Sequence, residues 1–238
     1  MTVNALIGMI LGLLMTPPVY LLASSLLTDP RALPRTGPTF VLLTSACTIT
    51  GIAITALAGV AVDHVPDVLL VGESASTALI SVIITAIAYT LFAFAVVAAA
   101  TVDVAERRIP NRITYPLIVV GVVGLPWLTQ PVTWWSLLTP LAGALASAAF
   151  ALINALVADQ GLGDVKLAAA IGAWTAHLGL AAWVTGVVIS QLLMVAAVAA
   201  TRVHRRRVGL PPDLTPLGPS LAGGAVLAVA VAALQISG

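Results

Sequence analysis

Apolar runs long enough to cross a lipid bilayer fill most of this 238-residue sequence, and short polar breaks separate them. Hydrophobic residues make up 60% of the chain and charged residues only 8%, whereas soluble globular domains carry about 25% charged residues. An apolar helix needs about 20 residues to cross the hydrocarbon core. The sequence therefore predicts an all-α fold, a polytopic transmembrane helical bundle in the cell membrane.

About eight apolar segments can be drawn against that length, and the fourth and sixth of them are short. Breaks that contain several prolines, such as residues 29–38 and 210–216, separate the segments, because proline does not continue a helix. The predicted segments are residues 5–27, 38–61, 77–101, 113–128, 135–158, 165–179, 181–201 and 218–236.

The number of helices in residues 165–201 depends on where the basic residues lie relative to the membrane. Short loops rich in Lys and Arg stay on the cytoplasmic side. Two helices separated near Gly179 place all ten Lys and Arg residues on one face, whereas one long helix moves the basic run 202–207 to the other face. We therefore predict two helices, with both chain termini outside. Asp103 and Asp164 then share the cytoplasmic face.

A polar hexapeptide, Gly161-Leu162-Gly163-Asp164-Val165-Lys166, is the most unusual stretch between the apolar runs. Glycines before an aspartate allow a close backbone approach, and Asp164 stands where a new helix can begin. A carboxylate at the membrane edge is costly, so it indicates a functional site with a partner. We predict Asp103, sixty-one residues upstream, as that partner.

Two carboxylates held close together cannot both ionise cheaply, so one keeps its proton while the other can act as a base. Such a pair can activate a water molecule against a peptide carbonyl and protonate the leaving amine, without a metal or cofactor. A simpler interpretation makes Asp103 a helix-end carboxylate that pairs with Arg107 in the next turn. Spacing alone leaves both interpretations open.

The other polar residues favour neither metal nor nucleic-acid binding. The single cysteine, Cys47, excludes a disulfide framework or a four-thiolate zinc site within one chain. His64, His177 and His204 lack the spacing of metal ligands. Anchoring against anionic membrane lipid explains the basic run 202–207 without nucleic acid.

Three stretches of the sequence resemble the type IV prepilin and preflagellin peptidases, which are membrane aspartic proteases of the GxGD type. Residues 161–174 resemble the second catalytic motif and its helix. Asp103 followed by Arg108-Ile109-Pro110-Asn111 is similar to the first motif. Residues 216–222 resemble the Gly-Pro opening of the last helix. The resemblance covers about residues 77–236.

This resemblance implies an aspartic endopeptidase that removes the leader of type IV or Tad-type prepilin-like precursors at the cytoplasmic face. It implies that Asp103 and Asp164 are the catalytic pair. It also implies a catalytic membrane domain at residues 77–238, preceded by a pair of transmembrane helices at residues 1–76. The supporting or substrate-binding residues that it implies are Gly161, Gly163, Lys166, Pro110 and Asn111.

Two features of the sequence depart from the family pattern. Many relatives carry an N-terminal region with paired CxxC zinc motifs that is linked to N-methylation. This chain has one cysteine, so we expect a short form that cleaves without methylating. Asp159 adds a third carboxylate before the second motif, where the family is often richer in glycine, and we expect it to be solvent-exposed.

Two other functions remain open from the sequence, which gives no oligomeric state. An ion-coupled transporter could hold a cation or proton at the same membrane-edge aspartates beside a broken helix. A catalytically inactive membrane scaffold of a pilus or secretion system could bind precursors without cutting them. Asn154 and Gln191 lie in apolar segments, where we expect each to form a hydrogen bond to a neighbouring helix.

Overall fold

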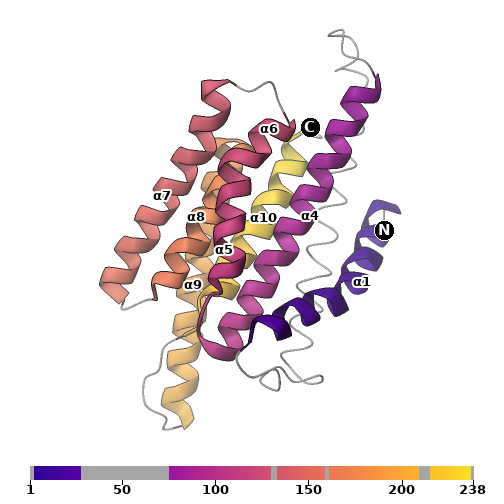
Figure 1. Cartoon of the computed structure of the whole chain (residues 1–238). Coiled ribbons are helices and arrows are strands. Elements are labelled where there is room, and N and C mark those ends of the chain that lie inside the picture. Colours follow the sequence, from indigo (N-terminus) through magenta and orange to yellow (C-terminus); the bar gives the residue numbers. More distant parts are fainter. Residues whose placement is uncertain (1–2, 28–74, 130–132, 159–160, 209–214, 237–238) are drawn as a thin grey trace.

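The structure, a computed structural model, describes residues 3–27, 75–129, 133–158, 161–208 and 215–236. Every regular element within these ranges is helical, which confirms the all-α prediction (Figure 1). The segment predicted at residues 38–61 lies outside the described residues, so only the first helix of the predicted N-terminal pair is described. The elements are α1 (Val3–Leu26), α4 (Ala75–Glu106), α5 (Asn111–Val119), the π-helix η2 (Val120–Gly124), α6 (Leu125–Thr129), α7 (Trp134–Ala158), α8 (Leu162–His177), α9 (Leu180–Val208) and α10 (Gly218–Ile236).

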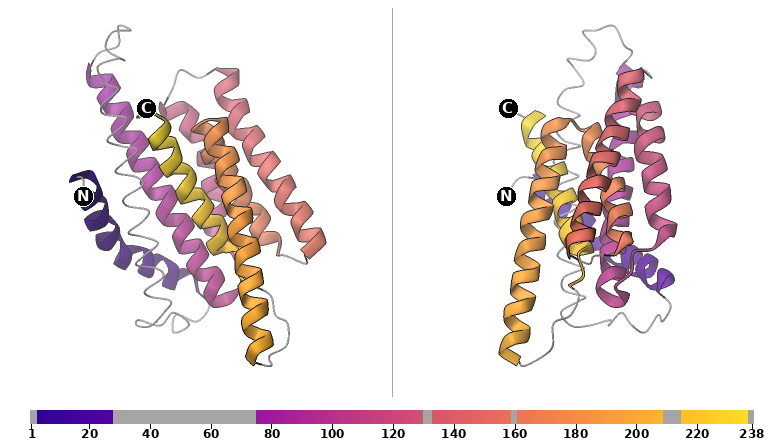
Figure 2. Two further views of the ribbon diagram at one scale, coloured as in Figure 1. Left: turned by 180° about the vertical axis from the view of Figure 1, so that it is seen from behind. Right: turned by 90° about the vertical axis from the view of Figure 1, so that its left-hand side faces the viewer.

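The short helix α8 lies at the centre of the bundle. It packs against α7, α5, η2, α9 and α10, while α4 packs against α1, α5, α6 and α10 (Figures 1 and 2). Almost every residue from Leu167 to Ala176 is buried. The sequence that follows Asp164 is therefore enclosed by the rest of the fold.

Small residues bring α7 and α8 into close contact, as their four-residue spacing predicts. A Cβ atom added at Gly172 would collide with the backbone oxygen of Gly143 and with Ser147. A larger residue at Gly143 or Gly172 would therefore push the two helices apart.

An aromatic cluster joins α4, η2 and α8 in the core. The ring of Phe92 stacks on Trp174 with centroids 4.4 Å apart, and Tyr89 meets Trp174 edge to face at 5.3 Å. Trp174 Nε1 donates a hydrogen bond to the Leu117 carbonyl at 2.8 Å, and the Tyr89 hydroxyl donates one to the Trp174 carbonyl at 2.9 Å. A Cβ atom at Gly121 in η2 would lie 2.6 Å from the Trp174 ring. The buried polar groups of the cluster are thus paired, as burial in an apolar medium requires.

A break at Gly179 separates α8 from α9, which confirms the two helices predicted for residues 165–201. Gly179 has a φ of +114°, a left-handed conformation that favours glycine. Three helices of the described part are long and apolar enough to cross a membrane: Ile83–Glu106, Trp134–Leu156 and Leu180–Val208. The predicted count of eight segments is not established by these helices.

The two ends of the bundle differ in chemistry. The end of α4, the starts of α5 and α8 and the end of α9 lie at the same lower end in Figure 1. These elements carry the Lys and Arg residues of the described part of the chain, namely Arg107, Arg108, Arg112, Lys166, Arg202, Arg205, Arg206 and Arg207. Three exposed tryptophans, Trp127, Trp134 and Trp135, belong to α6 and the start of α7 at the other end. Tryptophan is enriched where a helix bundle meets the membrane–water interface.

Candidate active site

Asp103 lies in the last turn of α4 and is only 6% exposed. Its Oδ2 atom accepts a hydrogen bond from the backbone N–H of Gly218 at 2.8 Å, and the backbone N–H of Leu217 also interacts with the carboxylate. Gly218 is the first residue of α10. Burial opposes ionisation of the Asp103 carboxyl. The N-terminus of a helix carries unpaired N–H groups and a partial positive charge, so this contact offsets part of that cost.

Gly218 is a site residue that was missing from the candidates drawn from the sequence. A Cβ atom added there would lie 3.0 Å from both Cβ and Oδ2 of Asp103, and 3.2 Å from the Ala100 Cα atom. Glycine therefore lets the carboxylate approach the helix start without displacement. The Gly-Pro pair at 218–219 could have indicated this residue, since it is part of the stretch that resembles the opening of the family's last helix.

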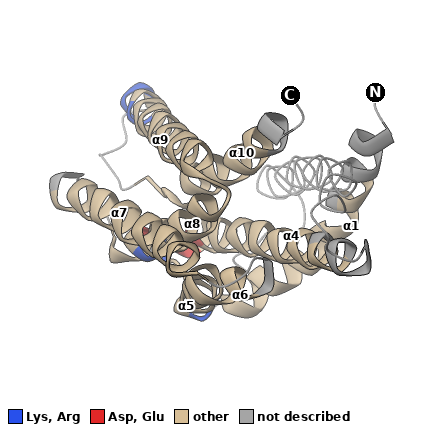
Figure 3. Cartoon of the chain, turned by 90° about the horizontal axis from the view of Figure 1, so that it is seen from above, with Lys and Arg blue, Asp and Glu red and all other residues tan. Residues whose placement is uncertain are grey.

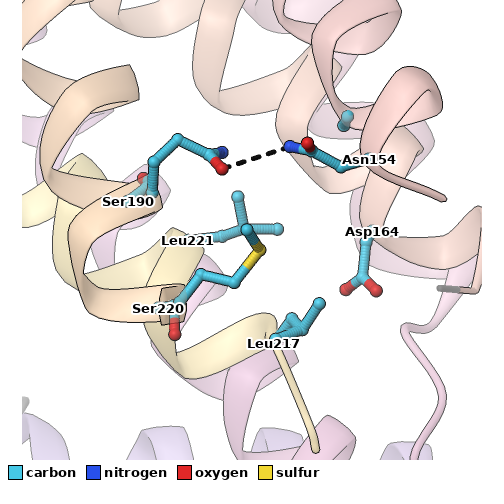
Figure 4. A pocket seen from close by; sticks show the side chains of 9 residues that line it. Asn154, Asp164, Ser190, Leu217, Ser220 and Leu221 are labelled. Atoms are coloured by element: carbon cyan, nitrogen blue, oxygen red, sulfur yellow. Dashed lines mark hydrogen bonds between the residues drawn. The ribbon is translucent and has the colours of Figure 1, made fainter. Parts of the chain in front are cut away.

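Asp164 lies in the first turn of α8, whose N-cap residue is Gly161. Its backbone N–H donates to the Gly161 carbonyl at 3.1 Å, which starts the helix. Its side chain faces a small pocket that Asn154 and Leu217 also line (Figure 4). The Oδ1 atom is buried and has no hydrogen-bond partner within the described residues. A buried, unpaired carboxylate oxygen is costly unless the group is protonated or binds a ligand.

The two aspartates are electrostatically coupled. Burial raises the pKa of the Asp164 carboxyl from 3.8 to about 7, and the negative charge of Asp103 adds to the rise. The structure thus brings together two carboxyl groups from helices that are far apart in the sequence. Viewed along the helices, acidic residues lie in the middle of the bundle beside α8 (Figure 3). Near neutral pH such a pair holds one proton more readily than none.

The turn after Asp103 packs directly on the start of α8. A Cβ atom at Gly163 would lie 3.2 Å from the Ile109 Cβ and 3.5 Å from its backbone nitrogen, so Gly163 permits this close approach. Lys166 Nζ donates a hydrogen bond to Asn111 Oδ1 at 3.0 Å and lies 5.2 Å from the centre of the Tyr115 ring. The stretches carrying the two aspartates are therefore held together by packing and by a side-chain bond.

Pro110 and Gly161 both act as N-cap residues. The Pro110 carbonyl accepts hydrogen bonds from the backbone N–H groups of Ile113 and Thr114, at 3.1 and 3.2 Å, and so starts α5. Gly161 has an ordinary φ of −73°, and a Cβ atom there would meet only the Gly163 nitrogen, at 3.9 Å. In contrast to Gly163, it makes no close contact that requires glycine.

Other polar residues from the sequence analysis occupy different places. Asn154 donates to Gln191 Oε1 at 3.1 Å, which confirms the expected bond between neighbouring helices. His177 ends α8 at the opposite end from Asp164. Asp159 and His64 lie outside the described residues. Within the described ranges, no three His, Cys, Asp or Glu residues are grouped so that they could hold a metal ion.

Apolar helices that enclose a coupled pair of carboxyl groups at a basic end define, as a class, a helical membrane protein with a buried pair of carboxyl groups. Comparison with known families is more specific: residues 89–201 match the model of the type IV leader peptidase family. This part of the chain is therefore similar to that peptidase family, which confirms the resemblance found in the sequence. The matched region contains both aspartates. No curated protein and no solved structure matches the chain.

Proposed function

We propose that this chain is an integral-membrane aspartic endopeptidase, with Asp103 and Asp164 as its catalytic pair. Its substrates are type IV or Tad-type prepilin-like precursors, from which it removes the leader peptide. The observation that carries the proposal is the electrostatic coupling of the two aspartates at the basic end of the bundle. The family match supplies the peptidase class.

The different environments of the two carboxyl groups suggest a division of roles. Burial disfavours ionisation of both carboxyl groups, but Asp103 accepts a hydrogen bond from the backbone N–H of Gly218, whereas Oδ1 of Asp164 has no partner within the described residues. Of the two, Asp103 is therefore better suited to be the general base. The pKa of Asp164 near 7 keeps a proton on this residue, which suits a general acid. Because the two titrations are coupled, the proton belongs to the pair until substrate binds.

The reaction then proceeds without a covalent intermediate. Asp103 removes a proton from a water molecule, and the hydroxyl oxygen adds to the scissile carbonyl carbon. The tetrahedral intermediate collapses with cleavage of the C–N bond, while Asp164 gives its proton to the leaving nitrogen. The products are the leader with a new carboxylate and the mature protein with a new amino group. The single cysteine supports a short form that does not N-methylate this amino group.

The distribution of basic residues supports a cytoplasmic active site in a multi-pass protein. The Lys and Arg residues of the described helices belong to the end that carries both aspartates. Basic residues near the ends of spanning helices stay on the cytoplasmic side. A basic leader that has not crossed the membrane can reach a site on that face.

The test is a cleavage assay in proteoliposomes with a prepilin-like precursor that has a short basic leader and one apolar helix. We expect the wild-type chain to shorten the precursor, and the variants Asp103→Asn and Asp164→Asn to leave it intact. Asp159→Asn, which removes a nearby carboxylate in the sequence, is the matched control and should cleave. Full cleavage by both active-site variants would overturn the proposal, and cation or proton flux lost in Asp164→Asn would favour a transporter.

A further inference from the structure

A groove between α7 and α9 extends from Asp164 into the bundle. One of its two adjoining pockets is lined by Asp164, Asn154 and Met194, and the other reaches Thr175 and Gly186. The two pockets share Ala151, Ser190, Gln191 and Leu221, so they form one continuous depression. We refer to this depression as the α7–α9 groove.

Side chains, rather than close packing, bridge α7 and α9. Within the described residues α7 packs mainly on α8, and α9 packs mainly on α10. Asn154 on α7 bonds to Gln191 on α9 at 3.1 Å, and Trp183 Nε1 on α9 bonds to Ser147 Oγ on α7 at 2.8 Å. Viewed along the bundle, α7 and α9 stand on either side of α8 (Figure 3). Rotation of a few side chains can therefore widen the groove without separating packed helices.

The amide side chains of the groove lie at its Asp164 end, whereas the hydroxyl groups of its farther part, Ser147 and Thr175, already bond to Trp183 and to the Ile171 carbonyl. Asn154, Ser190, Gln191 and Ser220 line the pocket that contains Asp164 (Figure 4). An amide side chain has two N–H donors and one carbonyl acceptor. The Asn154–Gln191 bond uses one donor of Asn154 and the acceptor of Gln191, which leaves the Asn154 carbonyl and the Gln191 N–H groups able to bind a peptide.

We infer that the α7–α9 groove receives the apolar segment of the precursor, and that Asn154 and Gln191 bind the extended backbone next to the scissile bond. This inference rests on the proposed function. If the scissile bond lies at Asp164, the precursor residues next to that bond must lie beside Asp164. The α7–α9 groove is a depression that leads away from this residue. Extended backbone in an apolar site needs hydrogen-bond partners, because unpaired peptide groups in lipid are costly. The two amides supply partners of both kinds.

The farther part of the groove has the character that a helical segment requires. Phe150, Ile171 and Val187 make its wall apolar, while Ala168 and Gly186 keep it shallow enough for close helix packing. Where the precursor is helical, its backbone N–H and C=O groups bond to each other within the helix and need no amide partners from the groove. The order of polar and then apolar lining from Asp164 matches an extended segment followed by a helix.

Disulfide cross-linking in proteoliposomes tests the position of the substrate. The Cys47→Ser background removes the single native cysteine, and Asp103→Asn keeps the precursor uncut. The precursor, one that the wild-type chain cleaves, carries one cysteine in the first turns of its apolar segment. We expect cross-links to Ala151→Cys and Met194→Cys, which line the groove, and none above background to Ile87→Cys or Leu145→Cys, which are 54% and 63% exposed on other helix faces.

Each other outcome of the cross-linking has a defined meaning. Equal or stronger cross-linking at Ile87→Cys overturns the inference. Absence of cross-links at the groove, with a precursor that wild type cleaves, also overturns the inference. A disulfide-linked pair of enzyme chains shows that a second copy occupies it. Failure of the wild-type chain to cleave any precursor is a failure of the proposed function itself.

Kinetics test the role of the amide pair. We expect Gln191→Leu and Asn154→Leu each to raise KM about threefold to tenfold with little change in kcat, since each removes about one hydrogen bond to the substrate. Leu192→Ala changes the neighbouring residue on α9, which is 65% exposed, and should leave KM unchanged. A purely structural bond would instead lower thermal stability and the amount of active enzyme while KM stayed constant, and this result would contradict the inference.

Discussion

The Asp103 carboxylate accepts a hydrogen bond at 2.8 Å from the backbone N–H of Gly218, a residue 115 positions later in the chain. This bond joins the last turn of α4 to the first residue of α10. It gives a physical reason for glycine at the start of the last helix, because a Cβ atom at Gly218 would crowd the carboxylate at 3.0 Å. The third family-like stretch therefore belongs to the same site as the two aspartates.

Gly218→Ala should lower cleavage while the protein still folds. The added methyl group would lie 3.0 Å from the Asp103 Oδ2 and Cβ atoms, so the carboxylate must move. The shift needed is a few tenths of an ångström. Because a misplacement of about 1 Å can cost about a hundredfold in rate, we expect a smaller loss in kcat, about severalfold to tenfold. Gly223→Ala is the matched control, because its methyl group would meet only the flexible end of Leu193. Equal activity of the two variants would contradict this role of Gly218.

Cleavage should depend on pH through the proton on Asp164. The pKa of this carboxyl is about 7, so its proton is present below that pH and is lost above it. As the general acid of the proposed mechanism, Asp164 should make kcat fall as the pH rises through about 7, and protonation of Asp103 should make it fall again in acid. The measurement is the pH profile of kcat in proteoliposomes. A flat profile from acidic to neutral pH would exclude this pair as the acid and base.

The same pKa shift predicts how Asp164 affects stability. Its folded-state pKa lies above the unfolded value near 3.8, so the proton is bound more tightly in the folded protein. This contribution is fully present at low pH and is lost as the pH rises through about 7. The melting temperature of Asp164→Asn minus that of wild type should therefore be larger at about pH 8 than at about pH 4. Melting curves in detergent at both pH values check this, and an equal difference at both would contradict it.

The sequence predicted the features that depend on local pattern and charge. Positive-inside bias, together with Gly179, separated α8 from α9, and the structure has a left-handed glycine at that position. The family resemblance, anchored on Asp103 and Asp164, is confirmed by the match over residues 89–201. These features are encoded within single segments or in the simple sum of loop charges.

What the sequence missed depends on contacts between distant helices. The hydrogen bond from Gly218 to Asp103 joins residues that are close in space but 115 positions apart, and a single sequence does not indicate this proximity. The close approach of the Trp174 ring to Gly121 in the π-helix η2 is likewise a contact with another helix. From the sequence, Lys166 was predicted only as a supporting or substrate-binding residue, and its bond to Asn111 depends on a contact between two helices.

Lys166 and Asn111 should act as one unit that positions the two aspartates. Their bond, 3.0 Å long, links the start of α5 to the first turns of α8. We expect Lys166→Met and Asn111→Ala each to lower kcat severalfold, and the double variant to lose no more than either single one. Lys166→Arg keeps a donor and should retain most of the activity. Fully additive losses in this double-mutant cycle would show that the two side chains act independently.

Trp174→Phe should destabilise the protein through the loss of one buried hydrogen bond. Phenylalanine keeps an aromatic ring against Phe92 but lacks the Nε1–H group that donates to Leu117. The Leu117 carbonyl also accepts a bond from the backbone N–H of Val120, so it keeps one partner, and the loss of the other bond costs about 0.5–1.5 kcal/mol. Trp127→Phe makes the same change at a side chain that is 66% exposed and should have little effect. Thermal unfolding in detergent measures both, and since Leu117 belongs to the α5 segment that packs on α8, the loss at Trp174 should also lower cleavage. An unchanged melting temperature for Trp174→Phe would contradict a stabilising role of the bond from Nε1.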